Sequence, residues 1–207
     1  MSTLIKINRF SLFKNDKKFE LNGEILENSF NIIGGPSGIG KSSFLLKLIG
    51  CNVESNGEIL IYSKNDEKYI VPSLNFSRKN ISYLQQSNTF SSFDIDNLIN
   101  KYENIKEFEA LNNLLFPNKE LNEVRYKSIK GTKGISGGQL KRLGLLIVLL
   151  TKKKIILLDE CDSGISKNAW FEILAYLLEI EASIILVSHN LDYYSNNNKI
   201  TKFLFQW

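Results

Sequence analysis

The stretch Gly35–Ser42, which reads Gly-Pro-Ser-Gly-Ile-Gly-Lys-Ser, constrains the fold of this chain more than any other feature. It matches the pattern G-x-x-x-x-G-K-[ST] in full, between the apolar segment Phe30–Ile33 and the segment Lys41–Ile49, whose apolar residues have helical spacing. Glycines let several backbone N–H groups point inward, and the helix N-terminus adds a partial positive charge. The stretch predicts a strand, a phosphate-binding loop and a helix in direct succession. The alternative is a glycine-rich turn with an incidental lysine.

Two side chains of this loop have specific expected roles. Lys41 is a compact cation suited to bridge the β- and γ-phosphates of a nucleotide, and the Ser42 hydroxyl is suited to ligate Mg²⁺. The residues expected to contact the nucleotide here are Gly35, Pro36, Ser37, Gly38, Ile39, Gly40, Lys41, Ser42 and Ser43.

The other periodicities predict an α/β fold. The short apolar segments Ile155–Leu158 and Ser183–Val187 alternate with the helical patterns Gln139–Leu150 and Ser166–Glu179. This alternation predicts a mostly parallel sheet covered on both faces. Alternating residues predict an early antiparallel pair of strands at Leu4–Leu12 and Phe19–Ile25, and further strands at Glu58–Tyr62, Ile81–Leu84 and Ile200–Phe205. Residues Asp94 to Phe116 have helical periodicity, interrupted near Lys101–Asn104 and ended by Pro117.

Composition excludes several classes of protein. The 207 residues are 43% hydrophobic and 23% charged, which is ordinary for one globular domain. A net charge of +4 is too small to predict a nucleic-acid partner. Cys51 and Cys161 lie far apart, which favours free thiols in a reducing compartment. Because Met1–Phe10 has no continuous apolar core and the longest apolar run is Leu143–Leu150, we expect neither a secretory signal nor a membrane span.

A pair of acidic residues forms the second part of the predicted phosphate site. The apolar strand that begins at Ile155 ends in Asp159 and Glu160. A carboxylate at the C-terminal end of such a strand can reach Mg²⁺ beside the phosphate loop, which is the role expected for Asp159. Glu160 is suited to accept a proton from, or to orient, the water that attacks the γ-phosphate. An acidic strand cap without a catalytic role is the alternative.

The segment Ile135–Arg142, Ile-Ser-Gly-Gly-Gln-Leu-Lys-Arg, lies between the two features above. Ser136 can cap the helix that follows, while Gly137 and Gly138 allow close approach of the backbone to an anion. With the phosphate loop and the Asp159-Glu160 strand in register, the chain resembles ABC-type nucleotide-binding domains over nearly its whole length. This segment resembles the signature motif of that family, whose nucleotide-contacting residues are here Ser136, Gly137, Gly138 and Gln139.

The resemblance assigns three further positions. Tyr83-Leu84-Gln85-Gln86 resembles the loop whose glutamine senses Mg²⁺ and the attacking water, and the register favours Gln86 over Gln85. Val187-Ser188-His189 resembles the switch histidine of the family. An aromatic residue upstream of the phosphate loop stacks on adenine in this family, and Phe13 is favoured here over Phe10.

The resemblance also implies an architecture and a mechanism. The fold is expected to be a P-loop NTPase core with an N-terminal antiparallel β subdomain and an inserted helical subdomain at roughly residues 87–135, all within one domain over 1–207. Two copies, as a homodimer or pseudo-homodimer, are expected to sandwich two ATP molecules with Mg²⁺. Hydrolysis then drives a separate integral membrane permease from the cytoplasmic, inner face of the membrane. A soluble ABC ATPase of an assembly or remodelling complex is the alternative. A P-loop kinase or a non-hydrolysing module would leave Glu160, the signature and His189 unexplained.

The chain departs from the family pattern after Glu160. Where proline and threonine are common, Cys161 and Asp162 stand, and the loop Ser163–Ser166 ends in serine rather than aspartate. That loop couples the two sites of the dimer in the family, so the departure concerns communication between subunits. We expect Asp162, a third carboxylate near the predicted metal site, to face solvent.

Overall fold

The computed structural model describes residues 2–14, 17–87, 92–130, 134–195 and 197–205. The chain divides into two compact units, which we describe one at a time. The phosphate-loop unit comprises Met1–Tyr83, Lys153–Glu160 and Leu178–Trp207, and the helical unit comprises Leu84–Lys152 and Cys161–Leu177. Within the predicted helical subdomain, residues 88–91 and 131–133 lie outside the described residues.

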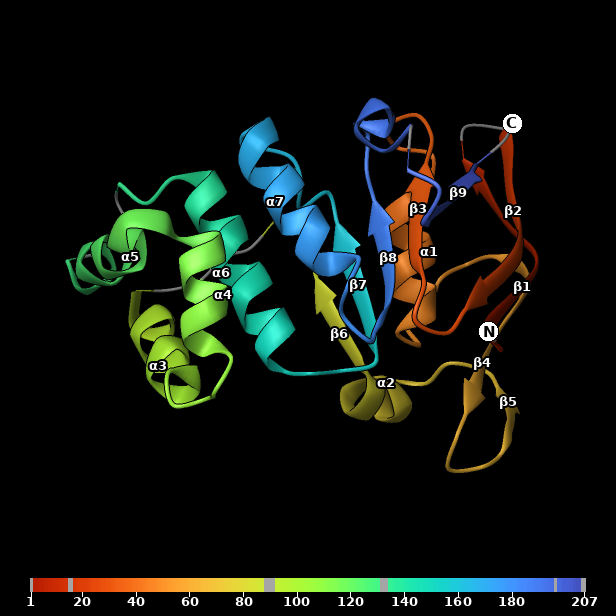
Figure 1. Ribbon diagram of the computed structural model, residues 1–207. Helices are drawn as coiled ribbons and strands as arrows, with labels where there is room; N and C mark the ends of the chain where they lie inside the picture. The colour runs from red at the N-terminus through yellow and green to blue at the C-terminus, as the bar shows by residue number, and fades with distance from the viewer. Residues whose placement is uncertain (1, 15–16, 88–91, 131–133, 196, 206–207) are drawn as a thin grey trace. The chain divides into compact units, whose positions relative to one another are not determined.

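The phosphate-loop unit contains an antiparallel sheet of four strands, in the order β2-β1-β4-β5 (Figure 1). Its strands are β1 (Thr3–Lys14), β2 (Lys17–Leu26), β4 (Asn56–Ser63) and β5 (Lys68–Ile70). β1 pairs with β2 and β4 in antiparallel register, and its apolar residues Ile5, Ile7 and Phe10 are buried in the core. The predicted antiparallel pair of early strands is confirmed.

The second sheet has five strands in the order β6-β7-β8-β3-β9 (Figure 1). They are β3 (Phe30–Gly34), β6 (Ile81–Leu84), β7 (Ile155–Asp159), β8 (Ser183–Val187) and β9 (Ile200–Leu204). The pairs β7–β8, β8–β3 and β3–β9 are parallel. Every residue of β3, β7 and β8 is buried, which explains why these strands are apolar throughout rather than alternating. β9 is an edge strand, as predicted.

The core of the phosphate-loop unit joins both sheets to α1 (Lys41–Leu48). Three aromatic rings, those of Phe10, Phe44 and Phe205, meet edge to face, with centroid separations of 5.4 to 6.5 Å. Such contacts add to the free energy of apolar burial and link β1, α1 and the residue after β9. The unit also contains α2 (Leu74–Asn80) and a 3₁₀ turn, η2 (Leu191–Tyr194).

The helical unit contains five α-helices within its described residues, which are α3 (Ser92–Tyr102), α4 (Phe108–Leu115), α5 (Glu120–Ile129), α6 (Gly137–Leu150) and α7 (Lys167–Leu177). The predicted break near residues 101–104 separates α3 from α4, and a 3₁₀ turn, η1 (Pro117–Lys119), follows α4. α3 packs on α5, and α4 packs on α6 and α7. None of the helices in the described part of the chain is long and apolar enough to span a bilayer.

Candidate nucleotide-binding site

The predicted phosphate loop follows β3 and leads directly into α1, as its sequence pattern requires. Gly35, Gly38 and Gly40 have φ values of 140°, 74° and 110°, in the region that favours glycine. A Cβ atom at Gly40 would lie 2.3 Å from Leu12 Cδ1, so a larger residue would force the end of the Leu12 side chain to move as well as adopt an unfavourable φ. No side chain caps the N-terminus of α1. The first N–H groups of α1 therefore have no side-chain acceptor and suit an anion.

Lys41 is held inside the loop that precedes it. The residue is 4% exposed, and its Nζ donates to the carbonyl oxygens of Gly35 and Pro36 at 2.9 Å each. Burial lowers the pKa of Lys41, and the carboxylates of Glu160 and Asp159 oppose that shift. The Lys41 ammonium group therefore points at the backbone of the phosphate loop.

Asp159 ends β7 and offers an oxygen suited to a metal ion. The residue is buried, and burial raises its pKa, whereas a hydrogen bond from Ser42 and a weaker one from Tyr83 lower it. Tyr83 Oη donates to Asp159 Oδ2 at 3.4 Å. Asp159 Oδ1 is buried and has no hydrogen-bond partner among the described residues. A buried carboxylate oxygen with open acceptor capacity, next to a serine hydroxyl, fits a hard cation such as Mg²⁺.

Glu160 and His189 meet at the ends of neighbouring strands. Glu160 has a left-handed backbone, with φ 50°, and its N–H donates to the carbonyl oxygen of Val187 at 2.9 Å. His189 Nε2 lies 2.8 Å from Glu160 Oε1 and 3.4 Å from Lys41 Nζ. A carboxylate, an imidazole and an ammonium group therefore converge beside the phosphate loop.

Phe13 and Phe10 differ sharply in exposure, although both lie on β1. Phe13 is 65% exposed and borders a cavity of about 500 Å³ that Ile39, Gly40 and Ser43 also line. Phe10 is fully buried in the aromatic cluster described above. Of the two aromatics considered from sequence, Phe13 is the one with a free ring face beside the loop.

The predicted signature forms the N-terminus of α6. Ser136 caps this helix as predicted, since its Oγ accepts from Gln139 N at 3.1 Å. Gln139 Oε1 accepts in turn from Ser136 N at 2.9 Å, which completes a capping box. A Cβ atom at Gly138 would lie 2.4 Å from the carbonyl oxygen of Gly164, whereas one at Gly137 would meet nothing within 4 Å. Gly138 therefore allows a close backbone contact within the unit, and Gly137 leaves the helix end open.

The predicted site residues are divided between the two units. Lys41, Ser42, Asp159, Glu160 and His189 come together in the phosphate-loop unit. Gln86 is exposed and belongs to the helical unit, as do Ser136, Gly137, Gly138 and Gln139. The roles of these residues stay predictions.

One expectation from sequence is wrong. Asp162 is 2% exposed, so it does not face solvent. It follows Cys161, which is also buried, and both residues lie in the turn directly after β7, a strand whose residues are all buried. The polarity of Asp162 therefore does not decide its exposure at this position.

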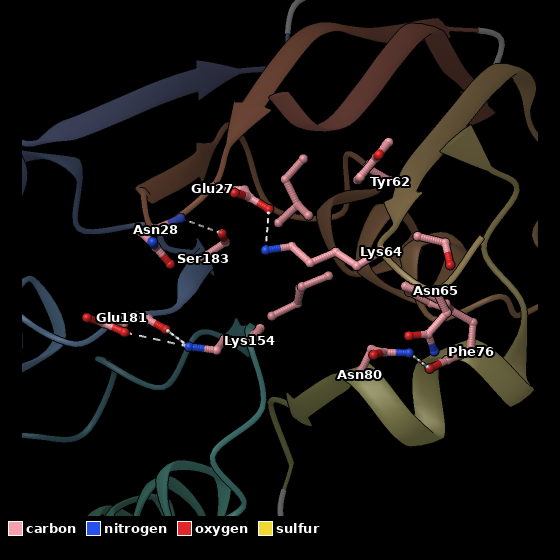
Figure 2. Close-up of a pocket in the computed structure, with 13 residues that line it drawn as sticks. Glu27, Asn28, Tyr62, Lys64, Asn65, Phe76, Asn80, Lys154, Glu181 and Ser183 are labelled. Atoms are coloured by element: carbon pink, nitrogen blue, oxygen red, sulfur yellow. Dashed lines mark hydrogen bonds and ion pairs between the residues drawn. The ribbon is translucent and has the colours of Figure 1, made fainter. Parts of the chain in front are cut away.

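A separate cavity of about 350 Å³ lies where strands of the parallel sheet begin, at the end opposite the phosphate loop (Figure 2). Ile155 and Ser183, which begin β7 and β8, are among its lining residues, whereas the phosphate loop follows the end of β3. Its two lysines pair with glutamates, Lys64 with Glu27 at 3.0 Å and Lys154 with Glu181 at 3.8 Å. Because these charges neutralise each other, the cavity offers no excess positive charge to a phosphate.

Comparisons with known proteins show the family to which the chain belongs. Residues 19–163 match the family described as ABC transporter. The chain is 29% identical over 199 residues to an ATP-dependent bile acid permease of Saccharomyces cerevisiae, covering 83% of this chain and 11% of that protein. It is 29% identical over 203 residues to the phosphate import ATP-binding protein PstB of Borrelia garinii subsp. bavariensis, covering 91% of this chain and 78% of that protein.

Solved structures share the fold at low sequence identity. A bacterial Atm1-family ABC exporter with ATP bound superposes with a TM-score of 0.70 at 18% identity, covering 99% of this chain and 38% of that chain. A nucleotide-free ATP-binding cassette from an ABC transporter gives 0.66 at 16% identity, covering 100% of this chain and 90% of that chain. The chain therefore belongs to the ABC transporter family, as a nucleotide-binding domain of the ABC ATPase class, with the predicted P-loop α/β fold.

Proposed function

We propose that the chain binds and hydrolyses ATP at the phosphate loop and thereby powers a separate membrane permease. The observation that carries this proposal is the convergence of Lys41, Asp159, Glu160 and His189 at the C-terminal edge of a parallel sheet, where α/β folds bind their ligands. The adenine ring stacks on Phe13, and the triphosphate occupies the loop from Gly35 to Ser43.

The residues that would hold Mg²⁺ are Ser42, Asp159 and Gln86. The open Oδ1 of Asp159 and the hydrogen bond between Ser42 and Asp159 support the first two. When bound, Mg²⁺ neutralises charge on the β- and γ-phosphates. Lys41 supplies a second positive charge from the loop, and together these groups favour the charge that develops as the terminal phosphate leaves.

Glu160 accepts the proton of, or orients, the attacking water. Its carboxylate is fixed twice, by the strained left-handed backbone and by the contact with His189. His189 holds that carboxylate in position and lies near the loop cation, so it can sense whether the γ-phosphate is present. Gln86 is assigned to the same water from the helical unit.

The signature, Ser136 to Gln139, binds the ATP of a second copy of this chain or of a close relative. Its open helix N-terminus, with Gly137 free of neighbouring atoms, supports contact with an anion from outside the chain. ATP then bridges the two subunits of a dimer, and the subunits separate after hydrolysis. We place the dimer on the cytoplasmic face of a membrane, bound to the permease and to no nucleic acid.

A pull-down of tagged Glu160→Gln protein from detergent-solubilised native cells, with ATP and Mg²⁺, tests this function. The variant should trap the ATP-bound dimer, and we expect a multi-span membrane protein in near-equal amount by mass spectrometry. The Lys41→Ala variant is the matched control and should recover less of that protein. Recovery of soluble proteins only, in repeated trials, would overturn the transporter role and favour an assembly or remodelling ATPase.

A further inference from the structure

A hydrogen-bonded network in the helical unit connects α5 to the start of α6, and Glu120 is at its centre. Glu120 Oε1 accepts from Gln139 Nε2 at 3.1 Å and from Arg142 at 2.8 Å, and Glu120 Oε2 accepts from Arg142 at 2.8 Å. Arg142 also donates to the carbonyl oxygen of Leu115 at 2.9 Å. The bidentate pair fixes both side chains in one plane.

This network fixes the direction of the Gln139 amide. A glutamine amide carries an acceptor oxygen on one side and a donor nitrogen on the other. The Glu120 carboxylate accepts hydrogen bonds only, so it requires the nitrogen of Gln139 to face it. The oxygen is then turned toward Ser136 N, which is the contact that closes the capping box. Glu120 therefore orients the first turn of α6 indirectly: it binds Gln139, and Gln139 binds Ser136.

Partial burial and charge both stabilise the ion pair between Glu120 and Arg142. The side chains of Arg142 and Glu120 are 16% and 26% exposed, and the guanidinium lies over the Phe116 ring at 5.2 Å. Arg142 lowers the pKa of Glu120, so the carboxylate is ionised at neutral pH. Glu120 is also the first residue of α5, where a negative charge is favourable.

We propose that Glu120 is a positioning residue for the signature: it holds Gln139, and through it Ser136 and Gly137, in the geometry that receives the second subunit's ATP. The inference rests on the proposed function for its consequence, but the local geometry can be measured in the monomer. Nothing in the sequence pattern indicated Glu120, which lies outside every motif.

The first test uses hydrogen exchange in the nucleotide-free monomer. In Glu120→Gln the carboxamide presents a donor as well as an acceptor, so it no longer dictates the direction of the Gln139 amide. We expect the amide of Ser136 to exchange about five- to tenfold faster, the loss typical of a helix cap. Glu123→Gln is the matched control, because Glu123 lies on the same helix in an exposed pair with Lys127. Equal exchange at Ser136 in the two variants would overturn the proposal.

The second test separates positioning from a merely structural ion pair. The reversed pair Glu120→Arg with Arg142→Glu restores opposite charges across α5 and α6. It places a donor against Gln139, however, so the amide must turn and its nitrogen faces Ser136 N. We expect the melting temperature to recover relative to Glu120→Arg alone, while Ser136 exchange stays fast. Recovery of slow exchange together with stability would mean that only the ion pair matters and would refute the positioning role.

The third test measures the consequence for the signature. For Glu120→Gln we expect unchanged ATP affinity of the monomer, a weakened ATP-dependent dimer, and an ATPase KM raised more than kcat is lowered. Ser136→Arg, which blocks the signature directly, defines full loss of the dimer. If Ser136→Arg abolishes the dimer while Glu120→Gln leaves it intact, the proposal fails. If wild-type protein forms no ATP-dependent dimer, the proposed function fails, and the exchange experiments still decide the local role of Glu120.

Discussion

Glu160 Oε1 and His189 Nε2 lie 2.8 Å apart because they follow two neighbouring strands of the parallel sheet. β7 ends at Asp159 and β8 ends at Val187, and these two residues are register partners. The pairing of β7 with β8 therefore brings the carboxylate and the imidazole together, because Glu160 lies one residue and His189 two residues beyond these strand ends.

Replacement of Glu160 by glutamine should leave ATP bound but slow its hydrolysis by roughly 10²- to 10⁴-fold, the loss expected when a positioned base is removed. Glutamine keeps an oxygen for His189, so the fold and the nucleotide affinity should survive. Single-turnover phosphate release, with ATP affinity measured in parallel, gives both quantities. Glu181→Gln, at the opposite edge of the sheet, is the control. Turnover at the wild-type rate would transfer the role of base to another group, with His189 the next candidate.

Replacement of Lys41 by alanine should weaken ATP binding by about 10²-fold or more. The side chain supplies the buried ammonium of the loop, and the loss is that of charge-assisted hydrogen bonds to the phosphates. Titration calorimetry with ATP and Mg²⁺ measures the change. Lys47→Ala is the matched control, because Lys47 is on the same helix and donates to the carbonyl oxygen of Val53. Near-normal affinity in Lys41→Ala would remove its assigned role.

Phe13 and Phe10 should respond to alanine in opposite ways. Phe13 is exposed, so Phe13→Ala should change the free energy of unfolding by less than about 0.5 kcal/mol while weakening ATP binding roughly tenfold through lost stacking. Phe10 is a core residue, so Phe10→Ala should cost about 3–5 kcal/mol of stability. Chemical denaturation and nucleotide titration distinguish the two. An unchanged ATP affinity in Phe13→Ala would assign adenine to another surface.

The stability that Glu120 contributes should depend on pH in a defined direction. The folded-state pKa of Glu120 lies below its ordinary value of 4.5, chiefly because of Arg142. The contribution is therefore complete above pH 4.5 and is lost as pH falls through the lower folded value. The difference in unfolding free energy between wild type and Glu120→Gln, about 1–2 kcal/mol for a charged hydrogen bond, should be constant from pH 6 to 8 and shrink below pH 4.5. Urea titrations at four pH values would test this, and a difference that grows on acidification would contradict it.

Most of the fold could be predicted because β3, β7 and β8 are short, fully buried strands, of which β3 and β7 lead into recognisable motifs, and because β1 and β2 have alternating apolar residues. The elements that sequence reasoning missed have weaker signals. β5 has only three residues, and α2 is a seven-residue helix whose cap, Ser73, is followed by a mixed sequence. α5 buries Leu121 and Val124 but is otherwise rich in charge, so its apolar stripe is narrow.

The candidate site could be predicted in part for a related reason. Lys41, Asp159 and Glu160 belong to contiguous motifs whose spacing fixes their geometry, and His189 follows a strand end in the same way. Glu120 acts across the gap between two helices, and single-sequence spacing does not encode that distance. The charge of Asp162 favours exposure to solvent, whereas the residue is buried in the turn after β7.

The position of β3 has a consequence for how the protein is made. β3 carries the phosphate loop, yet both of its sheet partners come from the other end of the chain, since Phe30 pairs with Ile184 in β8 and with Ile200 in β9. A ribosome needs roughly 10–30 s to add the intervening residues. During that interval the loop has been synthesised but lacks the strands that hold it, and Phe205 has not yet joined the aromatic cluster with Phe10 and Phe44. A nascent chain should therefore acquire ATP binding abruptly, only once β8 and β9 have left the ribosome.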